Sequence, residues 1–209
     1  MLAVEAARIG ARLIHFSTDY VFDGSKSSPY AEADTTVPVS IYGLTKRDGE
    51  LAILAAKGNA LILRTSWVYG IHGANFMKTM LRLGRERDEL SVVDDQFGAP
   101  TWTRHLADAT AMLIAGAPAT KGIFHLTAAG RTTWHDYAAT IFAEAMRLGL
   151  IEKAPLLRRV ASTNWPTPAR RPTNSVLDCS RLSQITGIAL PDWRVGLVDC
   201  LTDLHLAKK

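Results

Sequence analysis

The stretch RLIHFSTD, residues 12–19, decides the fold because it joins a short, largely apolar run to a polar end. Such a run is typical of a strand buried in a parallel sheet. A second stretch, NALILRTSWVY at residues 59–69, has the same form. Hydroxyl and aromatic side chains close both stretches, in STDY at 17–20 and TSWVY at 65–69, where a core strand needs neither.

The rest of the chain alternates between predicted helices and strands. Helices are predicted at residues 2–9, 40–56, 74–88, 102–116, 132–149 and 178–187, and further strands at 90–95 and 122–128. Ser40 and either Thr132 or Thr133 are suitable N-caps, and Gly10 is a suitable C-cap. Residues 21–40 form a long loop rich in Gly, Ser and Pro, and such loops are usually functional.

This alternation predicts an α/β fold with a mostly parallel sheet. Ligands bind such sheets at the carboxyl ends of the strands. The polar ends of the two buried strands are therefore the first place to look for a site.

Composition restricts the class of protein. The 209 residues are 47% hydrophobic and 21% charged, which suits one domain or one and a half. The net charge of +4 is spread along the chain without a Lys/Arg block, so nucleic-acid binding is not expected. No apolar run reaches the ~18 residues of a membrane span, and the start lacks the basic region of a signal peptide. The two cysteines, Cys179 and Cys200, have no CxxC spacing, which indicates reduced thiols in a cytoplasmic protein.

A tyrosine and a lysine four residues apart, Tyr42 and Lys46, fall in the predicted helix 40–56. Residues at this spacing share a helix face, and a nearby ammonium lowers the pKa of a phenol. Such a tyrosine can act as a general acid toward a carbonyl oxygen, and a hydroxyl at a strand end, such as that of Thr18, can bind the same oxygen. The pair alone is also common on helix surfaces by chance.

Several separated motifs resemble one enzyme family. STDYVFDG (17–24), PVSIYGLTKRDGE (38–50) and LRTSWVYG (63–70) resemble the extended short-chain dehydrogenase/reductases. Four more segments narrow the resemblance to the dTDP-4-dehydrorhamnose reductases: NFMKTMLRL (75–83), VVDDQFGAPT (92–101), GIFHLTAAGRTTWHDYA (122–138) and PTPARRPTNSVLD (166–178).

The resemblance implies a reaction and its residues. The C4 keto group of dTDP-4-dehydro-6-deoxy-L-mannose would be reduced to dTDP-L-rhamnose by NADPH or NADH. Positions that match the family's motifs are, for catalysis, Thr18, Tyr42 and Lys46; for the cofactor, Ser17 with Tyr42 and Lys46; and for the nucleotide sugar, Thr18, Asp19, Trp67, Asn75 and Arg170.

Two of these assignments have alternatives. Arg170 and its neighbour Arg171 suit a pyrophosphate, but they also suit a solvated surface. Asn75 can contact the ligand or simply cap the helix that follows it.

A glycine-rich cofactor turn is absent from the sequence, which contains neither G-x-G-x-x-G nor G-x-x-G-x-x-G. The resemblance therefore implies an incomplete Rossmann-like parallel sheet whose N-terminal strands are missing. Residues 1–98 would form the cofactor-side domain with the Tyr/Lys pair, and residues 99–209 a smaller, interleaved substrate-binding α/β portion. The chain would then be a fragment, a partner that completes its sheet with another polypeptide, or an inactive truncated product. A non-catalytic regulatory or binding subunit is a further alternative.

No metal site is predicted, because the six histidines show no ligand spacing. The resemblance adds Mg²⁺ at a homodimer contact as a minor expectation, with Asp199 and Asp203 as candidate ligands.

Overall fold

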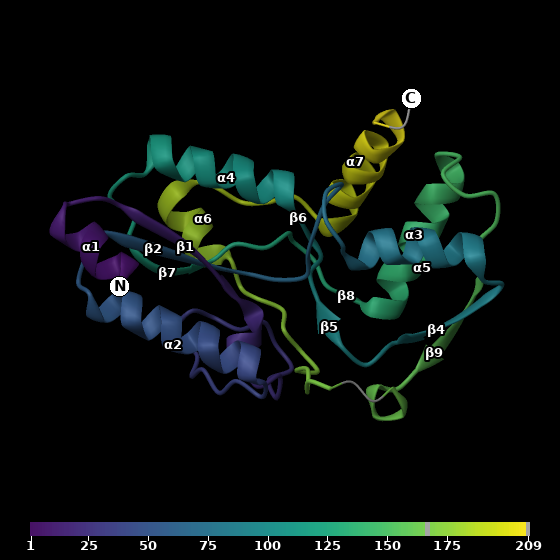
Figure 1. Cartoon of the computed structure of the whole chain (residues 1–209), viewed down its shortest axis with the longest axis horizontal. Coiled ribbons are helices and arrows are strands. Elements are labelled where there is room, and N and C mark those ends of the chain that lie inside the picture. The colour runs from purple at the N-terminus through teal and green to yellow at the C-terminus, as the bar shows by residue number, and fades with distance from the viewer. Residues whose placement is uncertain (166–167, 208–209) are drawn as a thin grey trace.

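A computed structural model describes residues 1–165 and 168–207, and it arranges them as two lobes side by side (Figure 1). One lobe is built on a parallel sheet, and the other on three helices with short paired strands. Every helix and strand expected from the sequence is present, with ends shifted by a few residues.

The first lobe contains a three-stranded parallel sheet in the order β1-β2-β7. Its strands are β1 (Leu13–Thr18), β2 (Ala60–Thr65) and β7 (Gly122–His125). The central strand β2 is buried along its whole length, as expected of a strand covered on both faces. Thr18 pairs with Thr65 in this register, so the carboxyl ends of β1 and β2 lie together.

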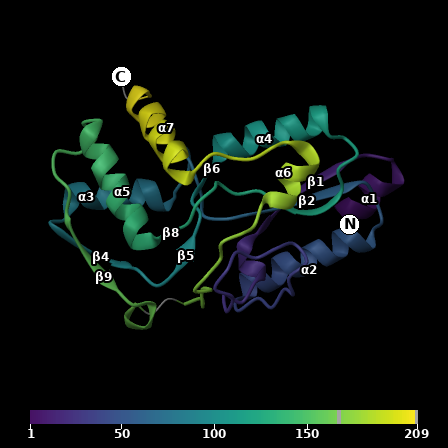
Figure 2. The same ribbon diagram turned by 180° about the vertical axis from the view of Figure 1, so that it is seen from behind.

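Helices cover both faces of this sheet (Figures 1 and 2). They are α1 (Leu2–Arg8) and α2 (Ile41–Ala55) on one face, and α4 (Thr103–Gly116) and α6 (Ser180–Thr186) on the other. Successive side chains of a strand point to opposite faces, so Leu61 and Leu63 of β2 pack against α4 and α6. Ile62 packs with Ile53 of α2 on the opposite face.

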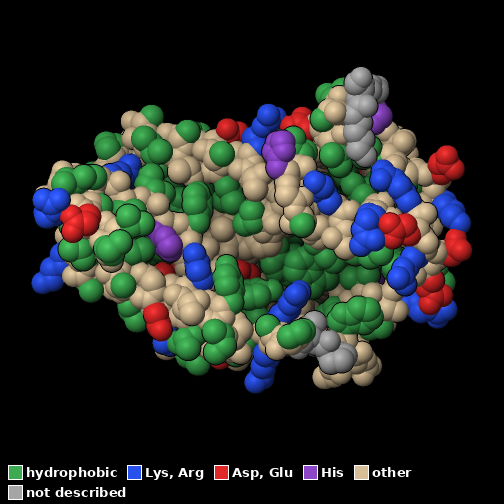
Figure 3. Space-filling view, viewed as in Figure 1, with side chains coloured by type: hydrophobic (Ala, Val, Ile, Leu, Met, Phe, Trp, Pro, Cys, Tyr) green, Lys and Arg blue, Asp and Glu red, His purple; other side chains and the backbone are tan. Residues whose placement is uncertain are grey.

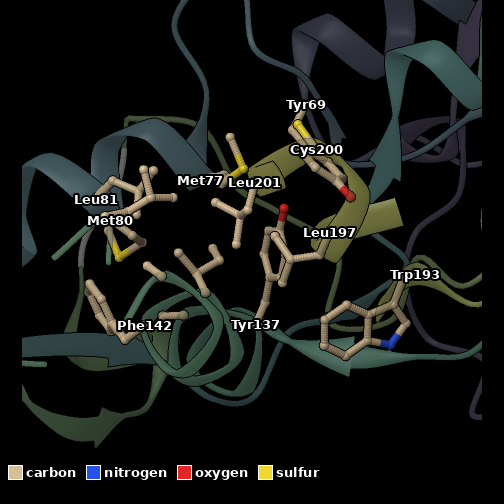
Figure 4. Close-up of a cluster of buried hydrophobic side chains, with 14 of the residues drawn as sticks. Tyr69, Met77, Met80, Leu81, Tyr137, Phe142, Trp193, Leu197, Cys200 and Leu201 are labelled. Carbon is tan, nitrogen blue, oxygen red and sulfur yellow. The ribbon is translucent and has the colours of Figure 1, made fainter. Parts of the chain in front are cut away.

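The second lobe surrounds a core between α3 (Phe76–Glu86), α5 (Trp134–Arg147) and α7 (Trp193–Leu206). Figure 4 shows side chains of all three helices meeting there, among them Met77, Tyr137 and Leu201. Short ladders frame the lobe. They are β3 (Val68–Tyr69) with β6 (Thr101–Trp102), β4 (Glu89–Val93) with β9 (Leu156–Val160), and β5 (Phe97–Gly98) with β8 (Thr132–Thr133). Two 3₁₀ turns, η1 (Asp19–Val21) and η2 (Ser162–Asn164), complete the elements.

The predicted helix ends are confirmed. Ser40 and Thr133 each accept a backbone N–H at the start of α2 and α5. Gly10, with φ +67°, lies two residues after α1 in the left-handed conformation that ends many helices. Neither α7 nor β9 was predicted from the sequence. The latter lacks alternating polarity because it is a half-exposed edge strand, and its arginine Arg158 forms an ion pair with Glu89 of the adjacent β4.

The chain crosses between the lobes more than once, since α4, β7 and α6 of the second half lie with the sheet. The division at residues 98 and 99 stays a prediction.

Among the described residues, β1 pairs on one side only, and Phe16 on it is 41% exposed. An apolar groove of about 520 Å³ runs beside it between Phe16 and Ile114 of α4.

A buried ion pair joins the catalytic-candidate helix to the sheet. Arg64 of β2 donates two hydrogen bonds to the carboxylate of Glu50 on α2, at 2.9 and 2.7 Å, and both side chains are at most 3% exposed. The guanidinium also lies 5.1 Å from the ring centre of Phe22. Bidentate geometry of this kind fixes orientation as well as distance.

Removing one partner of this pair will destabilise the fold strongly, because the other charge is left buried without compensation. We expect Arg64→Ala to lower the free energy of unfolding by about 3–5 kcal/mol. The control Arg82→Ala, which removes an exposed pair with Glu86, will cost about 0.5 kcal/mol. Urea unfolding measures the loss of stability in both variants. Equal unfolding midpoints would contradict the role of Arg64 in holding α2 against the sheet.

Candidate active site

A pocket of about 440 Å³ lies at the carboxyl ends of β1 and β2. Six of the side chains expected from the sequence line it, namely Ser17, Thr18, Asp19, Tyr42, Trp67 and Arg170. Figure 3 shows hydrophobic side chains gathered in the hollow between the lobes, with Lys or Arg side chains along its lower rim. The parallel register accounts for this convergence, because it brings the end of β1 beside the end of β2.

Thr18 and Asp19 form a buried pair on the floor of the pocket. The hydroxyl of Thr18 donates to Asp19 Oδ1 at 2.9 Å and accepts the backbone N–H of Tyr20 at 3.2 Å. Burial raises the pKa of the Asp19 carboxyl to about 7, although the hydroxyls of Ser175 and Thr18 act in the opposite direction. A carboxyl that titrates near neutral pH inside a cleft is a feature of functional sites.

Tyr42 and Lys46 come from the first turns of α2. Tyr42 is 54% exposed at the rim, and its ring meets that of Tyr20 edge to face at 6.3 Å. The ammonium of Lys46 donates to the carbonyl oxygen of Phe16 on β1 at 2.6 Å, which holds it against the strand that carries Thr18. The helix thus presents both side chains toward the same strand end.

Trp67 is held in an unusual conformation. Its φ is +45°, a region that side chains other than glycine rarely adopt and that commonly marks functional sites. Its indole stacks on that of Trp134 with ring centres 3.5 Å apart and planes 5° from parallel. The opposite neighbour is Gly98, where an added Cβ would lie 2.3 Å from the indole. A glycine is therefore required for Trp67 to lie in this slot.

Several buried polar atoms of the pocket have no hydrogen-bond partner. They are Ser17 Oγ, Asp19 Oδ2, Thr65 Oγ1, Trp67 Nε1 and Trp134 Nε1. Buried polar groups are almost always paired, so a cluster of orphans around one cavity points to a ligand or water that satisfies them. We infer that the pocket is built to bind a polar molecule.

A second pocket of about 580 Å³ adjoins the first. It is lined by Phe76 and Met80 of α3 and Val92 of β4, together with polar side chains such as Glu89 and Gln96. Trp134 and Arg171 line both pockets. The two cavities therefore meet at an indole and an arginine.

Asn75 is placed differently from the other residues predicted to contact the nucleotide sugar, because it lines neither pocket. Lys46, predicted for the cofactor, also lines neither pocket. The amide of Asn75 accepts the N–H of Lys78 at 3.1 Å and donates to the carbonyl of Gly70 at 2.7 Å. These bonds cap α3, which favours the capping interpretation left open by the sequence.

Sequence reasoning missed Thr65 and Trp134. Thr65 ends the second buried strand, in the same way as Thr18 ends the first, so the pairing of two parallel strands was the available signal. Trp134 begins α5 and has no local motif that marks it as a pocket residue.

One cluster of metal-ligating groups occurs among the described residues, formed by Asp94, His135 and Asp136. Arg159 donates to both carboxylates, at 2.6 Å to Asp94 and 3.0 Å to Asp136, so a guanidinium already pairs with them. Exposed acidic groups are common without a metal, and we assign no ion here.

The candidate Mg²⁺ ligand Asp203 pairs with Arg104 at 2.7 Å. The Mg²⁺ expectation stays a prediction. Across the described ranges, no helix combines the length and apolarity that crossing a bilayer requires.

Comparison with known proteins identifies the family of the chain. The family model described as "RmlD substrate binding domain" matches residues 1–206. The dTDP-4-dehydrorhamnose reductase of Shigella flexneri is 50% identical over 206 residues, which cover 97% of this chain and 69% of that protein. The enzyme of the same name from Escherichia coli K12 is 48% identical with the same coverage.

Solved structures agree. The dTDP-4-dehydrorhamnose reductase of Bacillus anthracis, in complex with NADP, superposes with a TM-score of 0.89 at 34% identity, covering 97% of this chain and 69% of that one. The Clostridium acetobutylicum structure of the same name gives 0.89 at 39% identity, with equal coverage.

The raised pKa of Asp19 makes stability depend on pH. Between about pH 4 and about pH 7 the unfolded carboxyl loses its proton while the folded one keeps it, so stability falls as pH rises through this window. We expect Asp19→Asn to match the unmodified chain near pH 4 and to exceed it near pH 8 by on the order of 2–4 kcal/mol. Chemical unfolding at both pH values measures this difference.

Asp108→Asn, on the exposed face of α4, is the control and will leave the pH dependence unchanged. A gain from Asp19→Asn that is equal at both pH values would show that folding leaves the pKa of this carboxyl unchanged.

Proposed function

We propose a function from one premise: the chain belongs to the family described as the RmlD substrate binding domain, and its relatives are dTDP-4-dehydrorhamnose reductases. The function is the NAD(P)H-dependent reduction of the C4 ketone of dTDP-4-dehydrorhamnose to dTDP-L-rhamnose. The observation that carries it is the convergence of Thr18, Tyr42 and Trp67 on one pocket whose buried polar atoms lack partners.

The sugar fits the first pocket. The orphaned hydroxyls of Ser17 and Thr65 and the indole N–H groups of Trp67 and Trp134 offer hydrogen bonds suited to a polar ring. The stacked indoles add an apolar face of the kind that packs well against sugars and bases. We therefore assign the reacting hexose to the strand ends.

The nucleotide fits the second pocket. Its lining by Phe76, Met80 and Val92 suits a thymine base, and Trp134 lies between the two cavities. Arg171 lines both cavities, and Arg170 lines the first, where planar guanidinium groups match phosphate oxygens. We assign these arginines to the pyrophosphate.

Residues of this chain also suit one end of the cofactor. Ser17 has an unpartnered hydroxyl beside the pocket, and Tyr42 and Lys46 lie on the adjoining helix, so these three suit the ribose and nicotinamide end. No glycine-rich turn for the pyrophosphate occurs in the 209 residues. When bound, NAD(P)H supplies the hydride to C4.

The protein's own part of the reaction is proton transfer and orientation. The Tyr42 O–H bond breaks as its proton passes to the C4 oxygen, and solvent reprotonates the phenolate. The positive charge of Lys46 stabilises that phenolate, and the Thr18 hydroxyl orients the reacting oxygen. The indole of Trp67 covers the sugar and limits the access of water.

Location and assembly follow the same reasoning. We propose the cytoplasm, because Cys179 and Cys200 are free thiols and nucleotide-sugar reduction consumes a cytoplasmic cofactor. A homodimer stays a prediction.

Tyr42→Phe tests the assignment by removing one oxygen. We expect NADPH oxidation in the presence of dTDP-4-dehydrorhamnose to fall by about 10²–10⁴-fold, because the proton donor is lost. The affinity for dTDP-L-rhamnose, measured by calorimetry, will stay close to that of the unmodified chain. Tyr30→Phe is the matched control, because its hydroxyl binds Asp23 outside both pockets.

Undiminished turnover by Tyr42→Phe would contradict the role of proton donor. Binding of dTDP-L-rhamnose by an unmodified chain that never oxidises NADPH would instead limit the function to substrate binding.

A further inference from the structure

The single proton of the Thr18 hydroxyl is already engaged in a hydrogen bond. That proton is donated to Asp19 Oδ1 at 2.9 Å, and one lone pair accepts the N–H of Tyr20 at 3.2 Å. A hydroxyl has one proton and two lone pairs, and an ionised carboxylate can only accept. With Asp19 ionised, Thr18 has only a lone pair left to offer a ligand.

Because of this restriction, Thr18 interacts differently with the substrate and with the product of the proposed reaction. The C4 oxygen of the substrate is a ketone, which has no proton and can only accept a hydrogen bond. The C4 oxygen of the product is an alcohol, which can donate to the remaining lone pair of Thr18. In the ionised state, therefore, Thr18 can bind the alcohol but cannot donate to the ketone.

Protonation of Asp19 allows the hydrogen bond between Thr18 and Asp19 to reverse its direction. A neutral carboxyl can donate to Thr18 Oγ1 across the same 2.9 Å contact. The threonine then accepts from both Asp19 and Tyr20, and its own proton is free to point into the pocket. A ketone oxygen there receives a hydrogen bond.

The surroundings of Asp19 permit this neutral form. The side chain is 2% exposed, and none of the ion pairs among the described residues includes it. Hydrogen bonds from the hydroxyls of Ser175 and Thr18 and from the backbone of Asp19 and Tyr20 favour the ionised form, but burial outweighs them and raises the pKa of the carboxyl to about 7.

Titratable and polar groups from several elements surround Asp19. Its own turn contributes the phenol of Tyr20, whose pKa is raised, mainly by burial, so it stays neutral. Helix α2 contributes Tyr42, and the segment before Asn174 contributes Arg170 and Arg171 at the pocket wall. The neutral hydroxyl of Ser175 faces the carboxyl from the other side.

We propose that Asp19 is a positioning residue that acts through Thr18: its neutral form turns the threonine hydroxyl toward a C4 ketone, and its ionised form leaves a site that accepts only the C4 alcohol. This inference rests on the proposed function, since it presumes that a nucleotide sugar occupies the pocket.

The test compares two ligands at two pH values. The ligands are dTDP-L-rhamnose, an alcohol at C4, and a dTDP-4-keto-6-deoxyhexose, and the dissociation constants come from calorimetry at about pH 5.5 and about pH 8.5, either side of the Asp19 pKa. For the unmodified chain, the ratio of the keto to the alcohol dissociation constant will rise by about 10-fold at the higher pH, the effect of one net hydrogen bond.

Variants separate this mechanism from a general effect of pH. Asp19→Asn carries an amide that donates to Thr18 at every pH, so its ratio will not change with pH. Thr18→Val lacks the hydroxyl, so its ratio will also be constant, with weak keto binding at both pH values. Asp108→Asn, exposed on α4 and outside both pockets, will keep the 10-fold change of the unmodified chain.

Two results would overturn the proposal in distinguishable ways. If both sugars bind the unmodified chain with a ratio independent of pH, this inference is wrong and the proposed function stands. If neither sugar binds at either pH, the proposed function fails and the inference fails with it.

Discussion

The buried ion pair between Glu50 and Arg64 is the constraint on which the site depends. It ties α2 to the central strand of the sheet with two hydrogen bonds inside the protein. Tyr42 and Lys46 lie on the same helix, so this buried ion pair sets the position of the proposed proton donor relative to the strand ends. Lys46 forms a second link between α2 and the sheet, because its ammonium donates a hydrogen bond to the carbonyl oxygen of Phe16 on β1. A reaction that needs a phenol beside a particular oxygen gains from a helix that cannot slide along its sheet.

The two pockets are lined by different kinds of side chain. The strand ends supply hydroxyls and a buried carboxyl, whereas the helical lobe supplies Phe76, Met80 and the indole of Trp134. A nucleotide sugar has the same division, with a polar hexose, a charged pyrophosphate and a flat base. The arginines at the junction lie where the charge of such a ligand would fall.

Much of the fold could be predicted from the sequence, because the buried strands and amphipathic helices carry local signals. The apolar runs ending in STDY and TSWVY predict both the strands and the place where the pocket lies. The Tyr-Lys spacing is informative only together with those strand ends. Asn75 shows the limit of motif matching, because its amide already forms hydrogen bonds with Lys78, at the start of α3, and with Gly70.

What the sequence could not supply arises from contacts between distant segments. Trp134 meets Trp67 across 67 positions of the chain, and nothing local to either residue predicts the stack. The pairing of Glu50 with Arg64 is hidden for the same reason. The strand β9 escapes detection because it depends on its neighbour β4 more than on its own pattern.

A crystal structure of the chain with dTDP-L-rhamnose tests the central claim most directly. The account predicts the C4 hydroxyl within hydrogen-bonding distance of Tyr42 and Thr18, at the carboxyl ends of β1 and β2, with the base in the pocket lined by Phe76. A sugar bound with its C4 oxygen away from Tyr42, or a nucleotide outside both pockets, would contradict it.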